Sequence, residues 1–505
     1  MESTNSKINE KYKENQTELI DLFKGIKSNF ILSKLFNFIK KKKILEMVKY
    51  NKNIKKRINV SVSDFKEYSE KYSSIVIEII PCNDKYGKFI NIQKENEKYY
   101  YIYFDNNKEE IKRNIINKDE IVKSIKIIIE YQEKSFEGLF DNCECIESIN
   151  FKTFVRNNIN NMKRMFNKCS SLKEINLNNF YTNNVKDMDY MFYECKSLKE
   201  LNLNNFNTNN VTNMSYMFCE CKSLKKLNLN GFYTNNVSDM SLMFGGCNSL
   251  MELNLNSFNT DKVTNMFKMF SNCSSLKELN LNNFNTNNVT NMDGLFWNCS
   301  SLIHLNLNNF NTNNVRYMGF IFHGCSSLKE LNLNNFNTNN VDWMRGMFMG
   351  CRSLKKLNLN NFNTNNVINM EGMFYYCQSL KELHLNNFNT NKVKYMNGMF
   401  YRCKSLKELN LNNFNTNNVT DMHDMFNGCK SLKELNLNNF NTNNVTNMSH
   451  MFYECKSLKD LNLNNFNTNN VTDMGCMFGG CLDELKTKIK IQYKNLEEEA
   501  FLEEE

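Results

Sequence analysis

Residues 198–223 read LKELNLNNFNTNNVTNMSYMFCECKS, and blocks of this 26-residue pattern follow one another from about residue 136 to residue 481. One cysteine marks each block, and these cysteines stand 26 residues apart from Cys143 to Cys481 without an insertion. A repeat of this regularity is typical of a solenoid, in which each unit stacks on the previous one and none folds alone.

Each block contains the signals of one coil. In the quoted block, Leu198, Leu201 and Leu203 predict a short strand with its leucines facing inward. Asn-rich residues 207–210 predict a turn, because Asn tolerates left-handed backbone and bonds to nearby backbone groups. The apolar residues from 211 to 221 recur at helical spacing. We therefore expect an α/β solenoid, a right-handed array of about 13 coils of 26 residues with one long parallel sheet.

Stacking in register also brings identical side chains together. The strand asparagines are expected to form coil-to-coil amide bonds; they include Asn176, Asn202, Asn228, Asn254 and Asn280.

The spacing Leu-x-x-Leu-x-Leu resembles the leucine-rich repeat. The longer pattern Phe-Asn-Thr-Asn-Asn-Val-x-x-Met-x-x-Met-Phe-x-x-Cys is similar to the repeat of BspA-like surface proteins, the Mycoplasma-type domain of unknown function. The resemblance covers residues 136–481 and implies a leucine-rich-repeat-like solenoid. Known relatives are often exported adhesins or antigens, so the resemblance also implies a surface adhesin or antigen as one alternative function.

Residues 1–58 form a basic region in which the apolar spacing predicts helix over 17–57. The order of its apolar residues, beginning with Ile31, Leu32, Leu35 and Phe36, resembles an F-box. That resemblance implies a substrate receptor of a ubiquitin ligase, which would bind a Skp1-like adaptor through these four residues.

Residues 59–135 predict a small mixed α/β module that caps the first coil, and residues 482–505 predict a C-terminal cap with an acidic tail. β-Branched and aromatic runs predict the strands of the module, and one helix is expected near its end. The expected strands are 60–62, 75–80, 89–92, 99–104 and 125–129, and the expected helix is 118–124.

The net charge of the chain is +9, and it is uneven. Residues 1–136 carry 28 basic and 20 acidic side chains, whereas residues 482–505 carry 4 basic and 8 acidic ones. A basic head raises the alternative of a nucleic-acid partner. We expect none, because the sequence shows no interleaving of aromatic and basic residues along one face.

The mean hydropathy is −0.57, and no apolar run is long enough to cross a membrane. The first residues lack the apolar core of a secretion signal. We therefore expect a cytoplasmic protein, with the nucleus as an alternative. A cell-surface location is expected only if an export signal lies outside this sequence.

The cysteines are expected to be free buried thiols, because they end the apolar face of each coil and share one environment. No catalytic constellation, cofactor motif or metal-ligand spacing is present, and the five histidines are scattered. The sequence therefore predicts a non-enzymatic protein-binding or scaffolding solenoid.

Specific contacts should come from residues that break the repeat, unless these breaks are drift among near-identical copies. On the expected concave sheet face, Lys226 and Lys356 replace Glu and are expected to leave local basic spots. The other candidates on this face are Met251, Ile303, His304 and His384. Outside it stand residue types that are enriched at binding hot spots; these are Trp297, Tyr317, Trp343 and Arg345.

Overall fold

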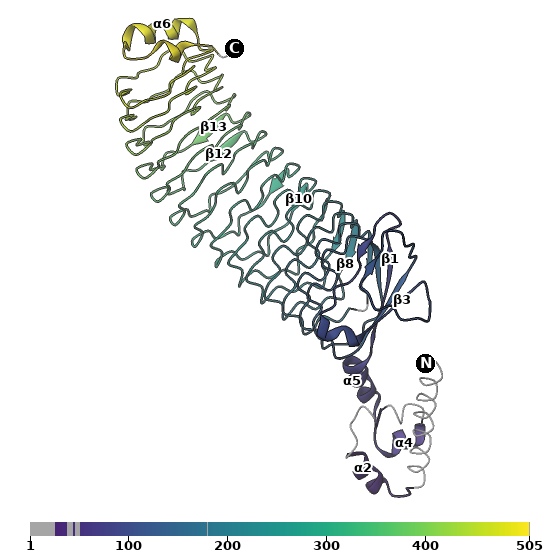
Figure 1. Ribbon diagram of the computed structural model, residues 1–505. Helices are drawn as coiled ribbons and strands as arrows, with labels where there is room; N and C mark the ends of the chain where they lie inside the picture. Colours follow the sequence, from purple (N-terminus) through teal and green to yellow (C-terminus); the bar gives the residue numbers. More distant parts are fainter. Residues whose placement is uncertain (1–25, 38–43, 46–50, 179, 504–505) are drawn as a thin grey trace.

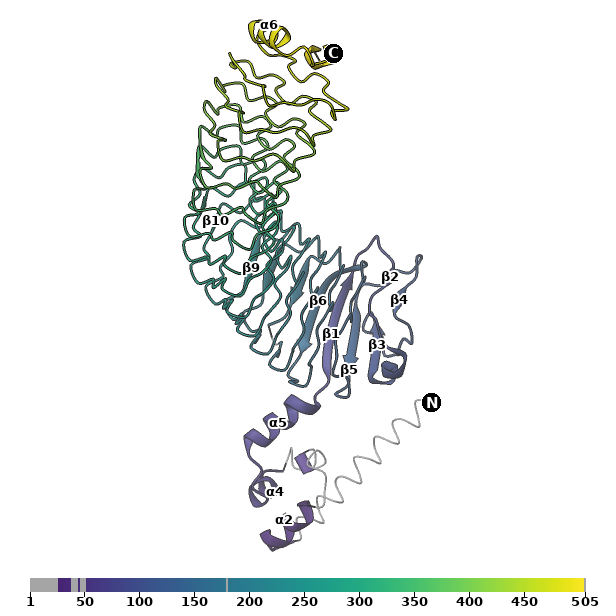
Figure 2. The ribbon, with the colours of Figure 1, turned by 90° about the vertical axis from the view of Figure 1, so that its left-hand side faces the viewer.

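The computed structural model describes residues 26–37, 44–45, 51–178 and 180–503. A small helical unit comes first, a five-stranded sheet follows, and stacked coils then extend to helix α6 (Asp483–Gln492) (Figure 1). Seen from the side, the stack is curved along its length (Figure 2). The chain is therefore a repeat solenoid with a different structure at each end.

The helical unit contains α2 (Asn29–Asn37), α4 (Lys52–Arg57) and α5 (Val62–Tyr72). Leu32, Phe36 and Ile54 form its buried core, which is separate from the core of the array. The helix predicted over 17–57 is thus present as α2 and α4. Residues 17–25, 38–43 and 46–50 lie outside the described part of the chain.

The strand predicted over residues 60–62 is wrong, because Ser61 begins α5 instead. The Ser61 side chain accepts a hydrogen bond from the amide of Asp64, and the Asp64 carboxylate accepts one from the amide of Ser61. This reciprocal capping box satisfies two amides that a helix start otherwise leaves unpaired.

The five-stranded sheet has the strand order β3-β5-β1-β6-β7. Pairing is antiparallel within β3-β5-β1-β6 and parallel between β6 and β7, so the sheet passes directly into the stacked coils. The bounds are β1 (Ile75–Pro81), β3 (Tyr100–Phe104), β5 (Ile125–Ile129), β6 (Ile146–Thr153) and β7 (Glu174–Asn176). The strands predicted over 75–80, 99–104 and 125–129 are confirmed.

Two other predictions for this module are wrong. Residues 89–92 form no strand; they connect the short β2 (Gly87–Lys88) to a 3-10 helix, η1 (Lys94–Tyr99). Strand β2 pairs with β4 (Ile115–Ile116). Residues 118–124 form no helix, because the Asp105 carboxylate accepts hydrogen bonds from the amides of Lys123 and Ser124 and holds the chain irregular just before β5.

Strand pairs within the coils are short and intermittent, so the prediction of one long parallel sheet is wrong. The further strands pair in register as β8-β9, β10-β11 and β12-β13. Their bounds are β8 (Glu200–Asn202), β9 (Lys226–Asn228), β10 (Glu278–Leu279), β11 (His304–Leu305), β12 (Lys356–Asn358) and β13 (Glu382–His384).

Charge at one strand position accounts for part of this interruption. Each parallel pair brings together residues that do not share a charge; these are Ser148 with Glu174, Glu200 with Lys226, Glu278 with His304, and Lys356 with Glu382. Where two glutamates would face each other, as at Glu252 and Glu278, the described residues form no strand pair, because like charges directly opposite destabilise a ladder. Lys226 with Glu252 and Glu330 with Lys356 also form no strand pair, and charge does not explain these two gaps.

A second line of contacts runs without interruption along the array. Single parallel β-bridges join residues 26 apart from Ser135 to Asp473, one bridge per coil, and we call this series the bridge ladder. The ladder occupies the position of Asn213 in the quoted block. It lies on the opposite side of the Asn-rich turn from the strand position, so each coil is held at two places.

The helix predicted in each coil is wrong, because this half of the coil consists of consecutive stacked turns. Tyr216 and Glu220 have left-handed backbone, with φ of 57° and 61°. The amide of Phe218 donates to the carbonyl of Met243 in the next coil at 2.9 Å. An α-helix would send that bond four residues back, whereas left-handed residues at this spacing redirect the backbone donors to the neighbouring coil.

Leu, Val, Met, Phe and Cys columns fill the interior between these two sides. Phenylalanine rings stack from coil to coil, as at Phe348 and Phe374, whose centroids lie 5.7 Å apart with an interplanar angle of 1°. Offset stacking of this kind adds to the apolar burial that holds the coils together.

The last coil is covered by the short segment η2 (Glu498–Phe501). The amide of Cys476 donates to the carbonyl of Glu499 at 2.8 Å, and the amide of Phe478 donates to the carbonyl of Ala500 at 2.7 Å. The ring of Phe501 stacks on Phe478 at 5.4 Å. Segment η2 thus makes the contacts that a following coil makes elsewhere.

None of the helices in the described part of the chain has the length and apolar character that crossing a bilayer requires.

Candidate interaction surfaces

The strand face consists of the outward residues at the positions of Lys199, Glu200 and Asn202 in each coil. Lysine fills the first position except at Glu147, Met251 and Ile303. Acidic residues fill the second position in most coils, so opposite charges run side by side along the array. This face is polar, exposed and close to neutral.

Lys226 and Lys356 do not form the expected basic spots. Lys226 forms an ion pair with Glu200 at 3.1 Å, and Lys356 forms one with Glu382 at 2.7 Å. Both pairs lie between neighbouring strands and are exposed to solvent, so each contributes at most about 1 kcal/mol. Their position explains the two lysines as coil-to-coil contacts within β8-β9 and β12-β13.

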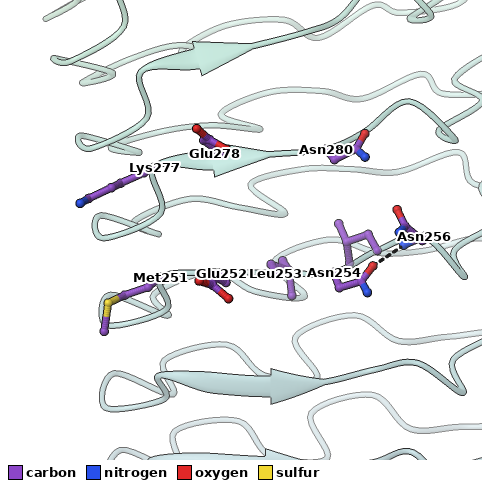
Figure 3. A pocket seen from close by; sticks show the side chains of 9 residues that line it. Met251, Glu252, Leu253, Asn254, Asn256, Lys277, Glu278 and Asn280 are labelled. Atoms are coloured by element: carbon purple, nitrogen blue, oxygen red, sulfur yellow. Dashed lines mark hydrogen bonds between the residues drawn. The ribbon is translucent and has the colours of Figure 1, made fainter.

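Three open grooves cross the strand face. One has a volume of about 1020 Å³, and its lining includes His304, Lys356 and His384. The second, of about 560 Å³, includes exposed Met251 (Figure 3), and the third, of about 850 Å³, includes both Lys226 and Met251. The structure thus brings three of the predicted residues together in one groove and two in another, whereas half-buried Ile303 is not part of these linings.

Asparagine side chains on this face act mainly within their own coil. The amide of Asn256 donates to Oδ1 of Asn254 at 3.0 Å, which closes a local turn (Figure 3). The expected coil-to-coil bond is present from Asn176 to Asn150, and Asn254 donates to Asn230 on the preceding coil. The predicted amide ladder is therefore correct only in part.

A buried threonine column makes the regular coil-to-coil hydrogen bonds that we expected from these asparagines. Thr286 Oγ1 donates to the carbonyl of Asn311 in the next coil and accepts from the amide of Asn311, both at 2.8 Å. Sequence reasoning missed this column, although the repeated Thr of the Asn-Thr-Asn-Asn turn was the available signal.

The turn edge is the second surface, formed by the bridge ladder, the residue before it and the stacked turns that follow it. Most coils carry Asn or Asp on the ladder. Such a side chain accepts a hydrogen bond from the amide two residues later, as Asn291 does from Asp293 at 3.0 Å. These Asx turns hold the start of the stacked turns in place.

Three aromatic residues replace Asx on the ladder within four consecutive coils. Tyr317, Trp343 and Tyr395 are 46%, 49% and 44% exposed. Tyr317 and Trp343 are direct ladder neighbours, and Asn369 stands between Trp343 and Tyr395. Sequence reasoning found the first two and missed Tyr395 and exposed Ile368, which precedes Asn369 in the coil before it. The register of both residues in the repeat was available as a signal.

Trp297 and Arg345 belong to a packed cluster on the same edge. The Trp297 ring lies 5.1 Å from Phe320 and 5.0 Å from His323, and the ammonium of Lys268 lies 4.1 Å above it. The Arg345 guanidinium lies 5.5 Å from the Phe320 ring. These side chains contact each other across coils. Trp297 is half-buried, whereas the Arg345 side chain is 44% exposed.

Cations and aromatic rings recur together along the turn edge, as in the pairs Arg164 with Tyr190 and Arg402 with Tyr401. The expectation that aromatic and basic residues do not interleave along one face is therefore wrong. The residues of a pair such as Arg164 and Tyr190 lie 26 positions apart in the chain and come together only when the coils stack.

The predicted adaptor-binding residues fall into two groups. Ile31 and Leu35 lie one helical turn apart on α2 and are 53% and 40% exposed, whereas Leu32 and Phe36 are buried in the core of the helical unit. Leu32 and Phe36 therefore cannot contact an adaptor without unfolding the unit, and their assignment to the adaptor surface is wrong.

All 18 cysteines are free in the structure, and only Cys82 and Cys476 are partly exposed. Burial raises the pKa of Cys299 and Cys429 to about 12. Thiols with so little thiolate are poor nucleophiles and poor metal ligands. The described residues also contain no cluster of three His, Cys, Asp or Glu side chains arranged to hold a metal ion.

A family model described as "Mycoplasma protein of unknown function, DUF285" matches residues 134–250, 223–330, 275–386, 302–409 and 378–491. The chain belongs to this family. The resemblance to the Mycoplasma-type repeat is therefore confirmed over the stacked coils.

This member of the DUF285 family has no match among curated proteins. Among solved structures it is similar to a leucine-rich repeat protein from Bacteroides ovatus, with 19% identity and a TM-score of 0.34 over 66% of this chain and 82% of the other. A complex of TLR13 with ssRNA13 is also similar, with 16% identity and a TM-score of 0.15 over 66% and 62%.

Proposed function

We propose that this chain is a non-enzymatic protein-binding scaffold built on an array of about thirteen 26-residue coils, and that its specific contacts are made by the turn edge between Tyr317 and Tyr395. The observation that supports the proposal is the replacement of Asx by exposed aromatic residues on the bridge ladder. Tyr and Trp are enriched at binding hot spots because they bring large contact areas and a polar group.

These replacements have a structural cost. A Tyr or Trp side chain has no carbonyl oxygen in reach of the amide two residues later, so the Asx bond is lost at Tyr317, Trp343 and Tyr395. Each such bond contributes about 0.5–1.5 kcal/mol. Three costly exchanges within four consecutive coils favour selection for an outside contact over drift.

The position before the ladder changes over the same four coils. Seven of the ten coils outside this window carry Thr or Ser there. The hydroxyl donates to the preceding coil, as Thr290 does to the carbonyl of Thr264 at 3.2 Å. Residues of different character take this place in the window; they are Arg316, Asp342, Ile368 and Lys394. Two neighbouring columns thus lose their structural residues together, which supports selection for an outside contact.

Affinity capture with a triple variant, Tyr317→Asn, Trp343→Asn and Tyr395→Asn, tests the proposal. The control is Tyr181→Asn with Tyr233→Asn, because these exposed tyrosines also replace Asn of the repeat but lie outside the window. Proteins captured from cells of the source should be lost with the triple variant and retained with the control. Equal capture by both variants would refute the assignment to the turn edge.

The exposed pair Ile31 and Leu35 favours a second candidate, docking of the helical unit on a Skp1-like adaptor. The proposal predicts that the full chain binds such an adaptor and that Ile31→Ser with Leu35→Ser abolishes binding. Lys34→Ser, on the same helix, is the matched control. Absence of binding by the unaltered chain would remove this candidate.

A further inference from the structure

We propose that the turn edge between Tyr317 and Tyr395 binds a proline-rich segment of another protein in the polyproline II conformation, with an acidic residue near one end. This inference rests on the proposed function and names the chemistry of the partner.

The backbone of the turn edge excludes one mode of peptide binding. The amide of Ile368 donates to the carbonyl of Asp342 at 3.0 Å, and the amide of Met370 donates to the carbonyl of Tyr395 at 3.0 Å. Because these backbone groups are engaged between coils, a partner cannot add itself as another strand. Recognition must use side chains, which suits a polyproline helix because it has no internal hydrogen bonds to exchange.

The spacing of the exposed rings matches that helix. Neighbouring strands lie about 4.8 Å apart, so Trp343 and Tyr395, which are two coils apart, stand about 9.6 Å apart at the backbone. Polyproline II advances about 9.3 Å in one turn of three residues. A helix running along the ladder therefore presents residues i and i+3 to the two rings in register.

The ladder residue between the two rings is almost fully buried, and an exposed apolar side chain lies next to it. Asn369 is 7% exposed, because its side chain folds back to accept the amide of Glu371 at 2.8 Å. Ile368 next to it is exposed. Compact prolyl rings fit such a site between aromatic side chains, and aromatic-lined sites are the usual receptors of proline-rich peptides.

The charges on this edge predict an acidic residue near one end of the partner segment. Arg316 pairs with Asp342 at 2.9 Å, and Arg345 pairs with Glu371 at 2.8 Å. No ion pair of the described residues involves Lys394, which lies beside Tyr395 at the end of the window. An acidic residue of the partner would compensate this charge.

The same charges argue against a nucleic acid. Asp342 and Glu371 neutralise Arg316 and Arg345, so these arginines do not offer the uncompensated positive charge that binding to a phosphate backbone uses. The exposed rings alone would suit stacked bases, so an RNA oligonucleotide is included in the test as the competing class.

Fluorescence anisotropy with the full chain tests the inference. The labelled probes are an octaproline peptide with a pair of aspartates at its N-terminus, the same peptide with the pair at its C-terminus, Gly/Ser peptides of equal length and charge, uncharged octaproline, and oligouridine. We expect one of the acidic proline peptides to bind about tenfold more tightly than its Gly/Ser counterpart. Trp343→Asn should weaken binding about tenfold, Lys394→Glu should weaken the acidic peptide more than uncharged octaproline, and Tyr181→Asn should change neither.

Three results would overturn the inference: equal affinity for proline and Gly/Ser peptides, no effect of Trp343→Asn in a chain whose thermal unfolding shows it to be folded, or tight binding of oligouridine alone. If the proline peptides fail while cellular capture still depends on the three aromatic residues, the partner chemistry is wrong and the proposed function stands. If cellular capture does not depend on these residues either, both the partner chemistry and the proposed function are wrong.

Discussion

Sγ of Cys221 lies 3.0 Å from the backbone carbonyl oxygen of Phe192 in the preceding coil, and the thiol donates a hydrogen bond to it. The same relationship recurs along the array, for example from Cys299 to Phe270 at 3.1 Å. The periodic cysteine is therefore both a small apolar residue and a donor that joins one coil to the next.

This arrangement predicts which thiols react. Cys82 and Cys476 are partly exposed, whereas the other cysteines are buried. We expect iodoacetamide at pH 8 to modify only Cys82 and Cys476 in the folded protein, and slowly at Cys82 because burial also raises the pKa of that thiol. Peptide mass spectrometry before and after urea unfolding checks this.

All 18 cysteines should react after unfolding without a reductant. Modification of Cys299 in the folded protein at the rate of Cys82 would show that the cysteine column opens to solvent. Missing thiols after unfolding would reveal disulfides and contradict the free state.

The threonine column predicts a difference between two similar variants. Thr286→Val keeps the shape of the side chain but leaves the amide and the carbonyl of Asn311 without the hydroxyl that serves both. We expect the free energy of unfolding to fall by about 2 kcal/mol. Thr286→Ser keeps the hydroxyl and loses one methyl group, at about 1 kcal/mol. Urea unfolding measures the free energy of unfolding of both variants. Equal losses of stability would show that the hydroxyl does not stabilise the stack.

Asp293 predicts part of the dependence of stability on pH. Burial raises the pKa of this carboxyl to about 6, although the ammonium of Lys268 opposes the shift. The folded state therefore holds this proton more tightly than the unfolded state does, and the free energy of unfolding falls as the pH rises from about 4 to 6. With solvent screening taken into account, we expect about 1 kcal/mol.

Urea unfolding between pH 4 and 7 tests this contribution. The variant Asp293→Asn should be more stable than the unaltered chain at pH 7 and should show a flatter profile between pH 4 and 6. A profile identical to that of the unaltered chain would mean that Asp293 titrates normally in the folded protein.

The stacked geometry predicts which deletions the array tolerates. Deleting residues 404–429 removes one whole period and returns every strand, threonine and cysteine to its column. Deleting residues 404–416 shifts the rest of the chain by half a period and places turns against strands. We expect the first variant to unfold cooperatively near the normal temperature and the second to lose its packing from that point. Circular dichroism melts compare them, and equal damage would contradict stacking in register.

The Asx turns predict that one turn-edge variant gains stability over another. Trp343→Asn supplies the acceptor for the amide of Arg345 that most other coils have at this position, whereas Trp343→Ala does not. We expect Trp343→Asn to be more stable than Trp343→Ala by about 1 kcal/mol in urea unfolding. Asn369→Ala should show the corresponding loss, because Asn369 already makes this bond. Equal stability of the Asn and Ala variants at residue 343 would contradict the structural cost of replacing Asx on the ladder.

The period of the cysteine was sufficient to predict stacking, the buried columns and the free thiols. It was not sufficient to predict the path of each coil. Val211, Met214 and Cys221 have the spacing of a helical face, but stacked turns bury residues at the same intervals. Tyr216 and Glu220 gave no sign of left-handed backbone; only other copies did, since Gly346 and Gly350 occupy the equivalent positions.

The candidate residues also divide into those that the sequence predicted correctly and those whose role depends on the stacked coils. Tyr317 and Trp343 were found because they break the repeat, and the structure places them on one exposed edge. Lys226 and Lys356 also break it, yet their ion pairs with the neighbouring strands give them a structural role. A break in a single repeat cannot distinguish the two cases, because the partner lies one period away and its contact depends on how the coils register.

Segment η2 has a consequence for the evolution of this chain. It reproduces the bonds of a following coil at Cys476 and Phe478, and Gly479 leaves room for the carbonyl of Leu502. The last coil and η2 therefore form one terminator that can close an array of any length. Recombination between the nearly identical repeats can therefore add or remove whole periods while the same terminator closes the last one. The length of the array becomes a heritable variable that is separate from the stability of its ends, and a lineage can change the distance from the first sheet to the tip without evolving a new end.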